Sequence, residues 1–351
     1  MRTIGCAPEL PAPKQALAPR NPGLADGQAA WREAMRALRQ FKREIMTKPA
    51  RDRFDVHQDI TSRIVQAIEA GAGTFVLPWH QGASTKMPVN ATTQRAYRGV
   101  NVLSLWITAQ ALGYRSHQWA TFKQWQSSGA QVRKGEKGTP IVFYKTLEIQ
   151  NPEPEQGQGE DAHSIPFARA SWVFNAEQVD GFAAATPELP TAPLFERLEQ
   201  ADKAIAATGA AIEYGGTQAF YDRGTDRIRV PDPSAFLGSP TSSPQESFYS
   251  TVLHELTHFS GAPHRLNREK GKRFADKPYC FEELIAELGA AFLCAELGIT
   301  NEPRPDHAQY IAQYLAILKE DKRAIFQAAT AATAATAYLL AFSSQSQESA
   351  A

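Results

Sequence analysis

The sequence predicts an α+β protein of two domains, in which a small mixed α/β domain precedes a mainly helical one. Helix-like and strand-like segments alternate in the first half of the chain, whereas nearly every patterned segment after residue 240 has helical spacing. A chain of 351 residues is also long enough for two domains, each with its own hydrophobic core.

The expected organisation has four parts, of which the first and the last are flexible. Residues rich in Pro, Ala and Gly begin the chain, and residues 27–46 within this arm can form one amphipathic helix. The stretch 183–193, rich in Ala, Thr and Pro, marks the boundary between the two domains. The arm, the first domain, the second domain and a disordered tail are expected at residues 1–53, 54–185, 194–342 and 343–351.

In the first domain, the spacing of apolar residues predicts helices over residues 59–69 and 101–112. Residues 141–147 and 171–175 have the pattern of strands. The acidic stretch 151–160 between them is interpreted as an insertion in a β-hairpin, because the second strand needs a partner.

In the second domain, a helix is expected from Leu194, followed by short strands at residues 212–214 and 227–230. Residues 306–342 are helical in pattern and rich in alanine, and the repeated Ala-Ala-Thr at residues 329–337 indicates close helix packing. Between these segments lie two further helices, which carry the most informative motifs of the chain.

Charge is unevenly distributed, although the formal net charge of the whole chain is zero. Residues 55–150 carry ten Lys and Arg against five Asp and Glu, a net charge of +5. Residues 151–300 carry twelve against twenty-two, a net charge of −10. A basic segment beside an acidic one favours an anionic partner for the first domain.

The three cysteines, Cys6, Cys280 and Cys294, have neither metal-binding nor redox spacing. We therefore expect a reducing compartment and no disulfide framework. No stretch resembles a signal peptide or a membrane span. A cytoplasmic location without a membrane partner is the resulting expectation.

The most informative motif is an HExxH pattern at residues 254–258. A capping box from Ser243 to Glu246 before it, and Gly261 after it, predict a helix through this segment. On a helix the two histidines lie one turn apart on one face and can bind one metal ion, and the adjacent Glu255 can act on an activated water molecule. We expect one Zn²⁺ ion, or another divalent metal ion in its place.

A second helix is predicted over residues 279–297, and it carries Glu283 and Glu287 at i, i+4 spacing beside an apolar surface. One carboxylate can bind the metal ion while the other orients an imidazole. The alternative, a solvated acidic edge, is disfavoured by the nearby HExxH motif.

These two helices resemble the zincin-type metallopeptidases in which HExxH is followed by a helix with a second glutamate motif. The resemblance implies that Glu255 is the catalytic base and that the metal ligands are His254, His258 and Glu283. It also implies that Glu287 is the partner of a ligand imidazole. Glu282 is the rival third ligand. It lies about 100° round the helix from Glu283 and has no carboxylate four residues on, so it ranks lower.

Such a site would perform metal-assisted hydrolysis, with Glu255 moving a proton from water to the leaving amine. A further group would stabilise the oxyanion. Four residues are close enough in sequence to be candidates, Tyr249, His264, Arg265 and Tyr279. The sequence leaves this choice open, since Tyr249 is equally explained as a core residue and Arg265 as an ion-pair partner.

Aromatic and basic residues interleave between residues 95 and 138. Aromatic side chains can stack on unpaired bases while Lys and Arg follow the phosphates, so this segment favours a single-stranded nucleic acid. No helix-turn-helix, zinc-finger or RNP signature supports readout of a duplex. The alternative is that the aromatic residues form the core and that the basic loop 133–138 is a solvated turn. The candidate contacts are Arg95, Tyr97, Arg98, Asn101, Trp119, Phe122, Trp125, Arg133, Lys134 and Lys137.

This segment resembles the N-terminal domain of the ArdC-type antirestriction proteins, which also occurs at the N-terminus of some conjugative-plasmid primases. The shared motifs are YRGVN at residues 97–101, GY at 113–114, WATFKQW at 119–125, KGEKG at 134–138 and FNAEQ at 174–178. The resemblance implies a single-stranded-DNA-binding domain joined to a zincin-like metallopeptidase domain. It also implies a family that is carried by mobile elements and protects incoming DNA from host restriction.

Three functions are compatible with these motifs. The first is an antirestriction protein that binds single-stranded DNA and carries a metal-dependent peptidase-like site for an unknown protein substrate. The second is a single-stranded-DNA-binding protein with a structural or vestigial metal centre. The third, a metal-dependent nuclease, is disfavoured because nucleases prefer two metal ions held by carboxylates. A primase is also disfavoured, since no primase catalytic region follows.

Overall fold

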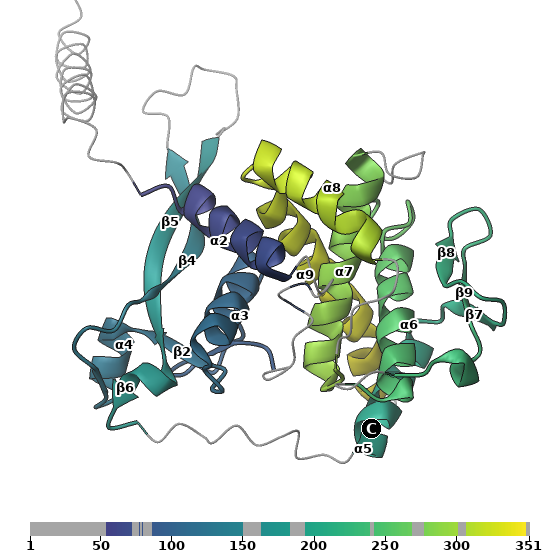
Figure 1. The fold of residues 1–351 in the computed structure, drawn as a ribbon, viewed down its shortest axis with the longest axis horizontal. Coiled ribbons are helices and arrows are strands. Elements are labelled where there is room, and N and C mark those ends of the chain that lie inside the picture. Colours follow the sequence, from purple (N-terminus) through teal and green to yellow (C-terminus); the bar gives the residue numbers. More distant parts are fainter. Residues whose placement is uncertain are drawn as a thin grey trace, which may run out of the picture. The chain divides into compact units, whose positions relative to one another are not determined.

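The computed structural model describes residues 54–71, 77, 79, 86–149, 163–182, 194–238, 242–268, 277–300 and 307–348. The chain separates into two compact units, Met1–Phe54 and Asp55–Ala351, and the helices and strands labelled in Figure 1 belong to the second. Three predicted features lie outside the described residues: the helix in the N-terminal arm, the acidic hairpin insertion and the boundary segment.

Among its described residues the N-terminal region has a four-stranded sheet, a two-stranded sheet and three α-helices, and Figure 1 shows their arrangement. Its elements are α2 (Val56–Gly71), β1 (Val89–Asn90), α3 (Val100–Leu112), β2 (Gln118–Thr121), α4 (Phe122–Ser127), β3 (Gln131–Val132), β4 (Thr139–Ile149), β5 (His163–Asn175) and β6 (Val179–Asp180). The larger sheet has the order β1-β2-β5-β4, in which β1 and β2 are parallel and the other neighbours antiparallel. The pairing of β4 with β5 confirms the predicted hairpin, whereas the sequence pattern does not predict β1, β2, β3, β6 or α4.

Helix α3 is fixed on β4 by one buried side chain. The helix ends at Gly113, whose positive φ of 71° closes it as a left-handed cap. Asn101 donates to the carbonyl of Val142 and accepts from its N–H, both at 2.8 Å. Both backbone groups of a strand residue are thereby satisfied from the helix, which sets the distance between α3 and the sheet.

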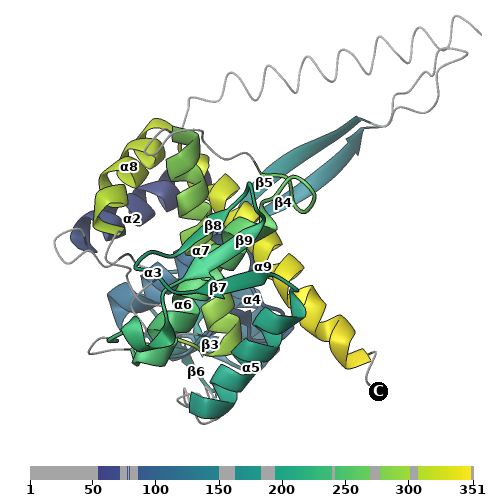
Figure 2. The same cartoon turned by 90° about the vertical axis from the view of Figure 1, so that its right-hand side faces the viewer.

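The C-terminal region has, among the described residues, five α-helices and a three-stranded sheet. Its elements are α5 (Leu194–Ala207), β7 (Ala211–Tyr214), β8 (Phe220–Asp222), β9 (Arg227–Val230), α6 (Pro244–Ser260), α7 (Lys277–Leu297), α8 (His307–Glu320) and α9 (Ala324–Glu348). The sheet order is β7-β9-β8, and the sheet lies along α6 (Figure 2). All the predicted segments are present, and β8 is additional. The prediction of a disordered tail from residue 343 is wrong as far as Glu348, because α9 continues to that residue.

One hydrophobic core continues from the N-terminal into the C-terminal region. It joins apolar residues of α2 and α3 to those of α7, α8 and α9. Trp106 of α3 packs against Phe292 of α7 with a ring-centroid distance of 5.8 Å, and the Thr61 hydroxyl of α2 donates to the Lys322 carbonyl at 2.7 Å. The two predicted domains therefore share their apolar packing, and the domain limits at residues 185 and 194 stay predictions.

Helix α9 packs against its neighbours through small residues. Ala329, Ala332 and Ala335 are fully buried, and the Gly99 N–H donates to the Thr333 hydroxyl at 3.0 Å. These contacts confirm the close packing predicted from the Ala-Ala-Thr repeat. By length and composition alone, residues 324–343 could cross a membrane, and 44% of this apolar stretch is buried inside the protein.

Candidate metal centre and nucleic-acid interface

Helix α6 places both histidines of the HExxH motif on one face. The hydroxyl of Ser243 accepts from the Glu246 N–H at 3.2 Å, and the Glu246 carboxylate accepts from the Ser243 N–H at 3.0 Å. This is the capping box that the sequence predicts, and it fixes where the helix begins. Four residues apart on α6, His254 and His258 have a ring-centroid separation of 4.9 Å.

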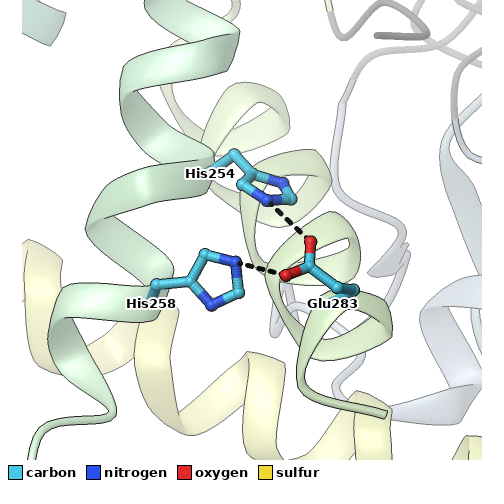
Figure 3. Close-up of side chains that lie close together, drawn as sticks. All are labelled: His254, His258 and Glu283. Atoms are coloured by element: carbon cyan, nitrogen blue, oxygen red, sulfur yellow. Dashed lines mark ion pairs between the residues drawn. The ribbon is translucent and has the colours of Figure 1, made fainter. Parts of the chain in front are cut away.

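Glu283 of α7 lies between the two imidazoles, as Figure 3 shows. Its Oε2 is 3.6 Å from His254 Nε2, and its Oε1 is 3.5 Å from His258 Nε2. All three side chains are buried, and their ligand atoms lie within 4.8 Å of one another. Two imidazole nitrogens and a carboxylate oxygen suit Zn²⁺ and leave a further coordination position open. The structure thus brings together the three residues predicted as ligands, and their chemistry fits the ion.

Each imidazole also faces a second carboxylate through its Nδ1 atom. Glu287 Oε1 lies 3.3 Å from His254 Nδ1, in the position predicted for it. Glu282 Oε1 lies 3.3 Å from His258 Nδ1, on the side of the ring away from the shared Nε2 cluster. Carboxylates in this position orient metal-binding histidines. From the sequence, Glu282 is predicted only as a rival ligand. Its contact with Nδ1 of His258 could not be predicted, because it depends on how α7 packs on α6.

Opposite charges compensate one another inside this cluster. Burial alone would raise the pKa of Glu283, but the neighbouring His258 and His254 hold it well below its usual value. Burial would likewise raise the pKa of Glu282, which hydrogen bonds from His258 and Arg268 lower instead. Burial would lower the pKa of His258, but the carboxylates of Glu283 and Glu282 raise it. The carboxylates therefore stay ionised, which is the state in which they bind a metal ion.

Two of the candidates for oxyanion stabilisation are held elsewhere, and a third is turned to solvent. Tyr249 donates its hydroxyl to Asp202 at 2.7 Å. Arg265 donates to both carboxylate oxygens of Asp226 at 2.9 and 2.8 Å, and its guanidinium covers the Phe259 ring. The His264 side chain is 62% exposed. None of these contacts involves the three predicted metal ligands.

Tyr279 lies near Glu283, and Glu255 is buried next to His254 in the chain. Burial and the nearby Glu283 carboxylate raise the pKa of Tyr279, and its hydroxyl lies 3.4 Å from that of Tyr310. Glu255 follows His254 directly on α6 and is 2% exposed. Of the four candidates, Tyr279 is therefore the one that lies near a predicted ligand, and the role of Glu255 as the base stays a prediction.

Four of the ten residues predicted to contact DNA belong to the interior: Tyr97, Asn101, Trp119 and Trp125 are 7, 9, 1 and 0% exposed. Trp125 donates its indole N–H to the Phe174 carbonyl at 3.0 Å, and Tyr97 donates its hydroxyl to the Trp119 carbonyl at 3.3 Å. The prediction that these side chains face a nucleic acid is wrong. The polar atoms of Tyr97, Asn101 and Trp125 satisfy backbone groups. The apolar surface of the aromatic residues fills the core, which is the alternative weighed for them.

Six predicted contacts remain at the surface: Arg95, Arg98, Phe122, Arg133, Lys134 and Lys137. Arg133 pairs with Glu136 at 3.0 Å and lies 3.7 Å from Asp180, so much of its charge is compensated. Phe122 is the first residue of α4 and is 43% exposed. Lys134 and Lys137 are exposed in the turn before β4.

Phe122 borders a shallow hollow of about 670 Å³, which Phe174, Lys134 and neighbouring residues of the 131–136 segment also line. The rings of Phe122 and Phe174 meet edge to face at 6.4 Å. A Cβ at Gly138 would lie 2.9 Å from Trp172 Cβ and 3.2 Å from the Phe174 ring, so glycine lets the turn approach both aromatics. We call the set Phe122, Trp172, Phe174, Lys134 and Lys137 the aromatic–basic surface.

Trp172 and Phe174 belong to this surface but are not among the ten candidate contacts predicted from the sequence. They lie two residues apart on β5, and this period of two is the signal that places them on one side of the strand. Trp172 is 45% exposed, whereas Val173 between them is fully buried.

Two family models match separate parts of the chain. The model of the N-terminal domain of the anti-restriction factor ArdC matches residues 54–174. The model of a zincin-like metallopeptidase matches residues 199–331. These matches agree with both resemblances and with the order of the two regions.

Relatives match over most of the chain. Protein y4eC of Sinorhizobium fredii is 44% identical over 282 residues, which are 79% of this chain and 89% of that protein. A DNA primase TraC of Escherichia coli is 35% identical over 300 residues, which are 82% of this chain but only 27% of the primase. Crystal structures of the antirestriction protein ArdC from plasmid R388, metal-free and Mn(II)-bound, are 38% identical, with TM-scores of 0.68 and 0.65. They cover 83% of this chain and 99% and 98% of their own, so the chain belongs to the family of ArdC antirestriction proteins.

Proposed function

We propose that this protein binds single-stranded DNA and carries a metal-dependent peptidase-like site. The observation that supports the second part is the buried set of His254, His258 and Glu283, with the buried Glu255 next to His254 in the chain. The donor set favours one Zn²⁺ ion. A relative has been crystallised with Mn(II), so another divalent ion is the alternative.

The chemistry that this proposal assigns is hydrolysis of a peptide bond in a protein substrate. When bound, the metal ion would activate a water molecule and polarise the scissile carbonyl. Glu255 accepts the proton of the water and returns it to the leaving amine. The Tyr279 hydroxyl donates a hydrogen bond to the carbonyl oxygen as negative charge develops on it. The Glu287 carboxylate, 3.3 Å from His254 Nδ1, would orient the imidazole for metal binding through Nε2.

For single-stranded DNA, the proposal relies on the aromatic–basic surface. Exposed aromatic rings offer stacking partners to unpaired bases, and they accept any base because every base has a π-face. Lys134 lines the hollow beside Phe122, which places a positive charge next to a stacking position. A duplex hides its base faces, so this combination favours a single strand.

The alternative is a DNA-binding protein with a structural or vestigial metal centre. The presence of Glu255 beside the ligands favours hydrolysis, since a purely structural site needs no base.

The test measures the survival of an unmodified plasmid in a restricting host, with wild type and Glu255→Gln. We expect Glu255→Gln to keep its metal ion and its affinity for single-stranded DNA while losing protection. Glu296→Gln, the same change at an outer position of α7, is the matched control. Full protection by Glu255→Gln would favour the DNA-binding alternative.

A further inference from the structure

Arg268 connects the two helices that carry the predicted metal ligands. From the loop after α6, its guanidinium donates to both oxygens of Glu282 on α7, from Nε at 3.1 Å and from Nη2 at 2.8 Å. It also donates to the end of α6, to Ser260 Oγ at 2.9 Å and to the Thr257 carbonyl. One side chain therefore ties α7 to the last turn of α6.

Glu282 contacts both Arg268 and His258. Its side chain is 1% exposed, and its Oε1 accepts from Arg268 while lying 3.3 Å from His258 Nδ1. A carboxylate at Nδ1 holds the proton on that nitrogen and leaves the lone pair on Nε2 for the metal ion. A carboxylate this deeply buried needs a compensating cation, and Arg268 supplies it with a two-pronged hydrogen bond.

Arg268 is itself held in place from the side of the small sheet. Arg223, which follows β8, donates to the carbonyl of Arg268 at 2.7 Å and to that of Gly261 at 2.9 Å. A Cβ at Gly261 would lie 2.7 Å from the Arg268 guanidinium, so any larger residue there would displace it. Arg223 thus holds the backbone of Arg268, and the close approach of Gly261 leaves room for its guanidinium beside Glu282.

We propose that Arg268 is a positioning residue for the metal centre, which acts through Glu282 on the His258 ring and on the spacing of α6 and α7. The inference rests on the proposed metal site. It adds a second carboxylate-to-histidine contact, separate from that of Glu287, and an arginine that the motifs do not include. Its consequence is that metal affinity depends on a residue that does not touch the metal ion.

The test measures Zn²⁺ affinity of the full-length chain by competition with a chelator. Second-layer partners of metal ligands typically control affinity by about 10- to 100-fold. We expect losses of this size in Arg268→Met and in Glu282→Gln. Arg268→Lys should lie between them and wild type, because an ammonium keeps the charge but loses the fork. Arg265→Met is the matched control, since Arg265 lies in the same loop but pairs with Asp226.

Two readouts separate positioning from other roles. The absorption spectrum of the Co²⁺-loaded protein should be the same in Arg268→Met as in wild type at saturation, because the ligands are unchanged. The double variant of Arg268→Met and Glu282→Gln should lose no more Zn²⁺ affinity than the more strongly impaired of the two single variants. The losses should not add, because Arg268 acts on His258 through Glu282.

Wild-type affinity in Arg268→Met, or an equal loss in Arg265→Met, would overturn the inference. If Arg268→Met does not fold, wild-type affinity in both Arg268→Lys and Glu282→Gln would overturn it instead. A spectrum of altered coordination in Glu282→Gln, with a normal one in Glu283→Gln, would make Glu282 the ligand. Absence of metal from the wild type would reject the proposed function itself, which is a different result.

Discussion

The metal centre and the aromatic–basic surface hold their charges in opposite ways. In the metal centre Glu282, Glu283 and Glu287 are buried, and each lies within 3.6 Å of a histidine nitrogen. At the aromatic–basic surface Lys134 and Lys137 are exposed to solvent. They also pack on different apolar clusters, since Phe174 packs against the cluster that contains Trp125 and Val132, whereas the apolar residues of α6 belong to another.

This difference determines what each region depends on. A buried charge is stable only when partners of opposite charge are held close to it. The stability of the candidate metal centre therefore depends on the positions of these partners and little on the salt concentration. Exposed lysines need no fixed partner, and their attraction to phosphates is screened by salt. The four substitutions below test this contrast, from the largest expected effect to the smallest.

Removal of the bridging carboxylate should have the largest effect. Glu283→Ala leaves His254 and His258 facing each other without a shared partner, and we expect the metal content to fall from about one ion per chain to almost none. Removing the carboxylate from its buried ion pairs with the two histidines should also lower the free energy of unfolding by about 3–5 kcal/mol. Elemental analysis after dialysis and urea denaturation measure the two losses. Full metal occupancy in this variant would remove Glu283 from the ligand set.

Among the aromatic residues, Trp125→Ala should cost stability. The change removes a fully buried ring and leaves the Phe174 carbonyl without its donor, so we expect a loss of about 3–5 kcal/mol in the free energy of unfolding. Urea denaturation measures it. A stable Trp125→Ala that binds DNA poorly would return Trp125 to the interface.

Phe122→Ala should weaken DNA binding and change stability little. We expect single-stranded DNA to bind more weakly by about 1–3 kcal/mol, because one stacking partner is lost. Stability should change by only about 1 kcal/mol, since the ring is 43% exposed and loses one edge-to-face contact with Phe174. Fluorescence anisotropy with a labelled oligonucleotide measures the affinity, with Phe143→Ala, an exposed phenylalanine of β4, as control. Equal losses in both variants would show that the hollow has no special role.

Lys134→Ala should have the smallest effect. One phosphate contact fewer lowers the slope of log affinity against log salt by about 0.7 for a single strand. Titrations at several salt concentrations measure this slope. Lys203→Ala on α5, far along the chain from the hollow, should leave it unchanged. An unaltered slope in Lys134→Ala would mean that this lysine contacts no phosphate.

The candidate ligand pairs within each helix could be predicted because their geometry is local, whereas the joining of the two helices into one site followed from the resemblance to zincin-type metallopeptidases. The spacing of His254 and His258 on one helix face follows from helical periodicity, and so does that of Glu283 and Glu287. The role of Glu282 could not be read in this way, since it depends on the rotation of α7 against α6. Arg268 lies fourteen positions before Glu282, and nothing local in its sequence marks it as a partner.

The aromatic residues show the limit of pattern reading. Trp125 and Phe122 lie three positions apart in the same motif, yet one is fully buried and the other is 43% exposed. Helix α4 is too short for its periodicity to separate them, and β2, which precedes it, is not predicted. Burial here depends on how α4 packs against β5, where Trp125 donates to the Phe174 carbonyl, and this packing is a long-range property.

The central claim is that one folded unit binds a metal ion and single-stranded DNA through separate residues. The most direct measurement determines both the metal content and the single-stranded-DNA affinity of Glu283→Gln and of Phe122→Ala. We predict that Glu283→Gln loses the metal ion and keeps its DNA affinity, and that Phe122→Ala does the opposite. A folded Glu283→Gln that loses DNA affinity as strongly as Phe122→Ala would contradict this account.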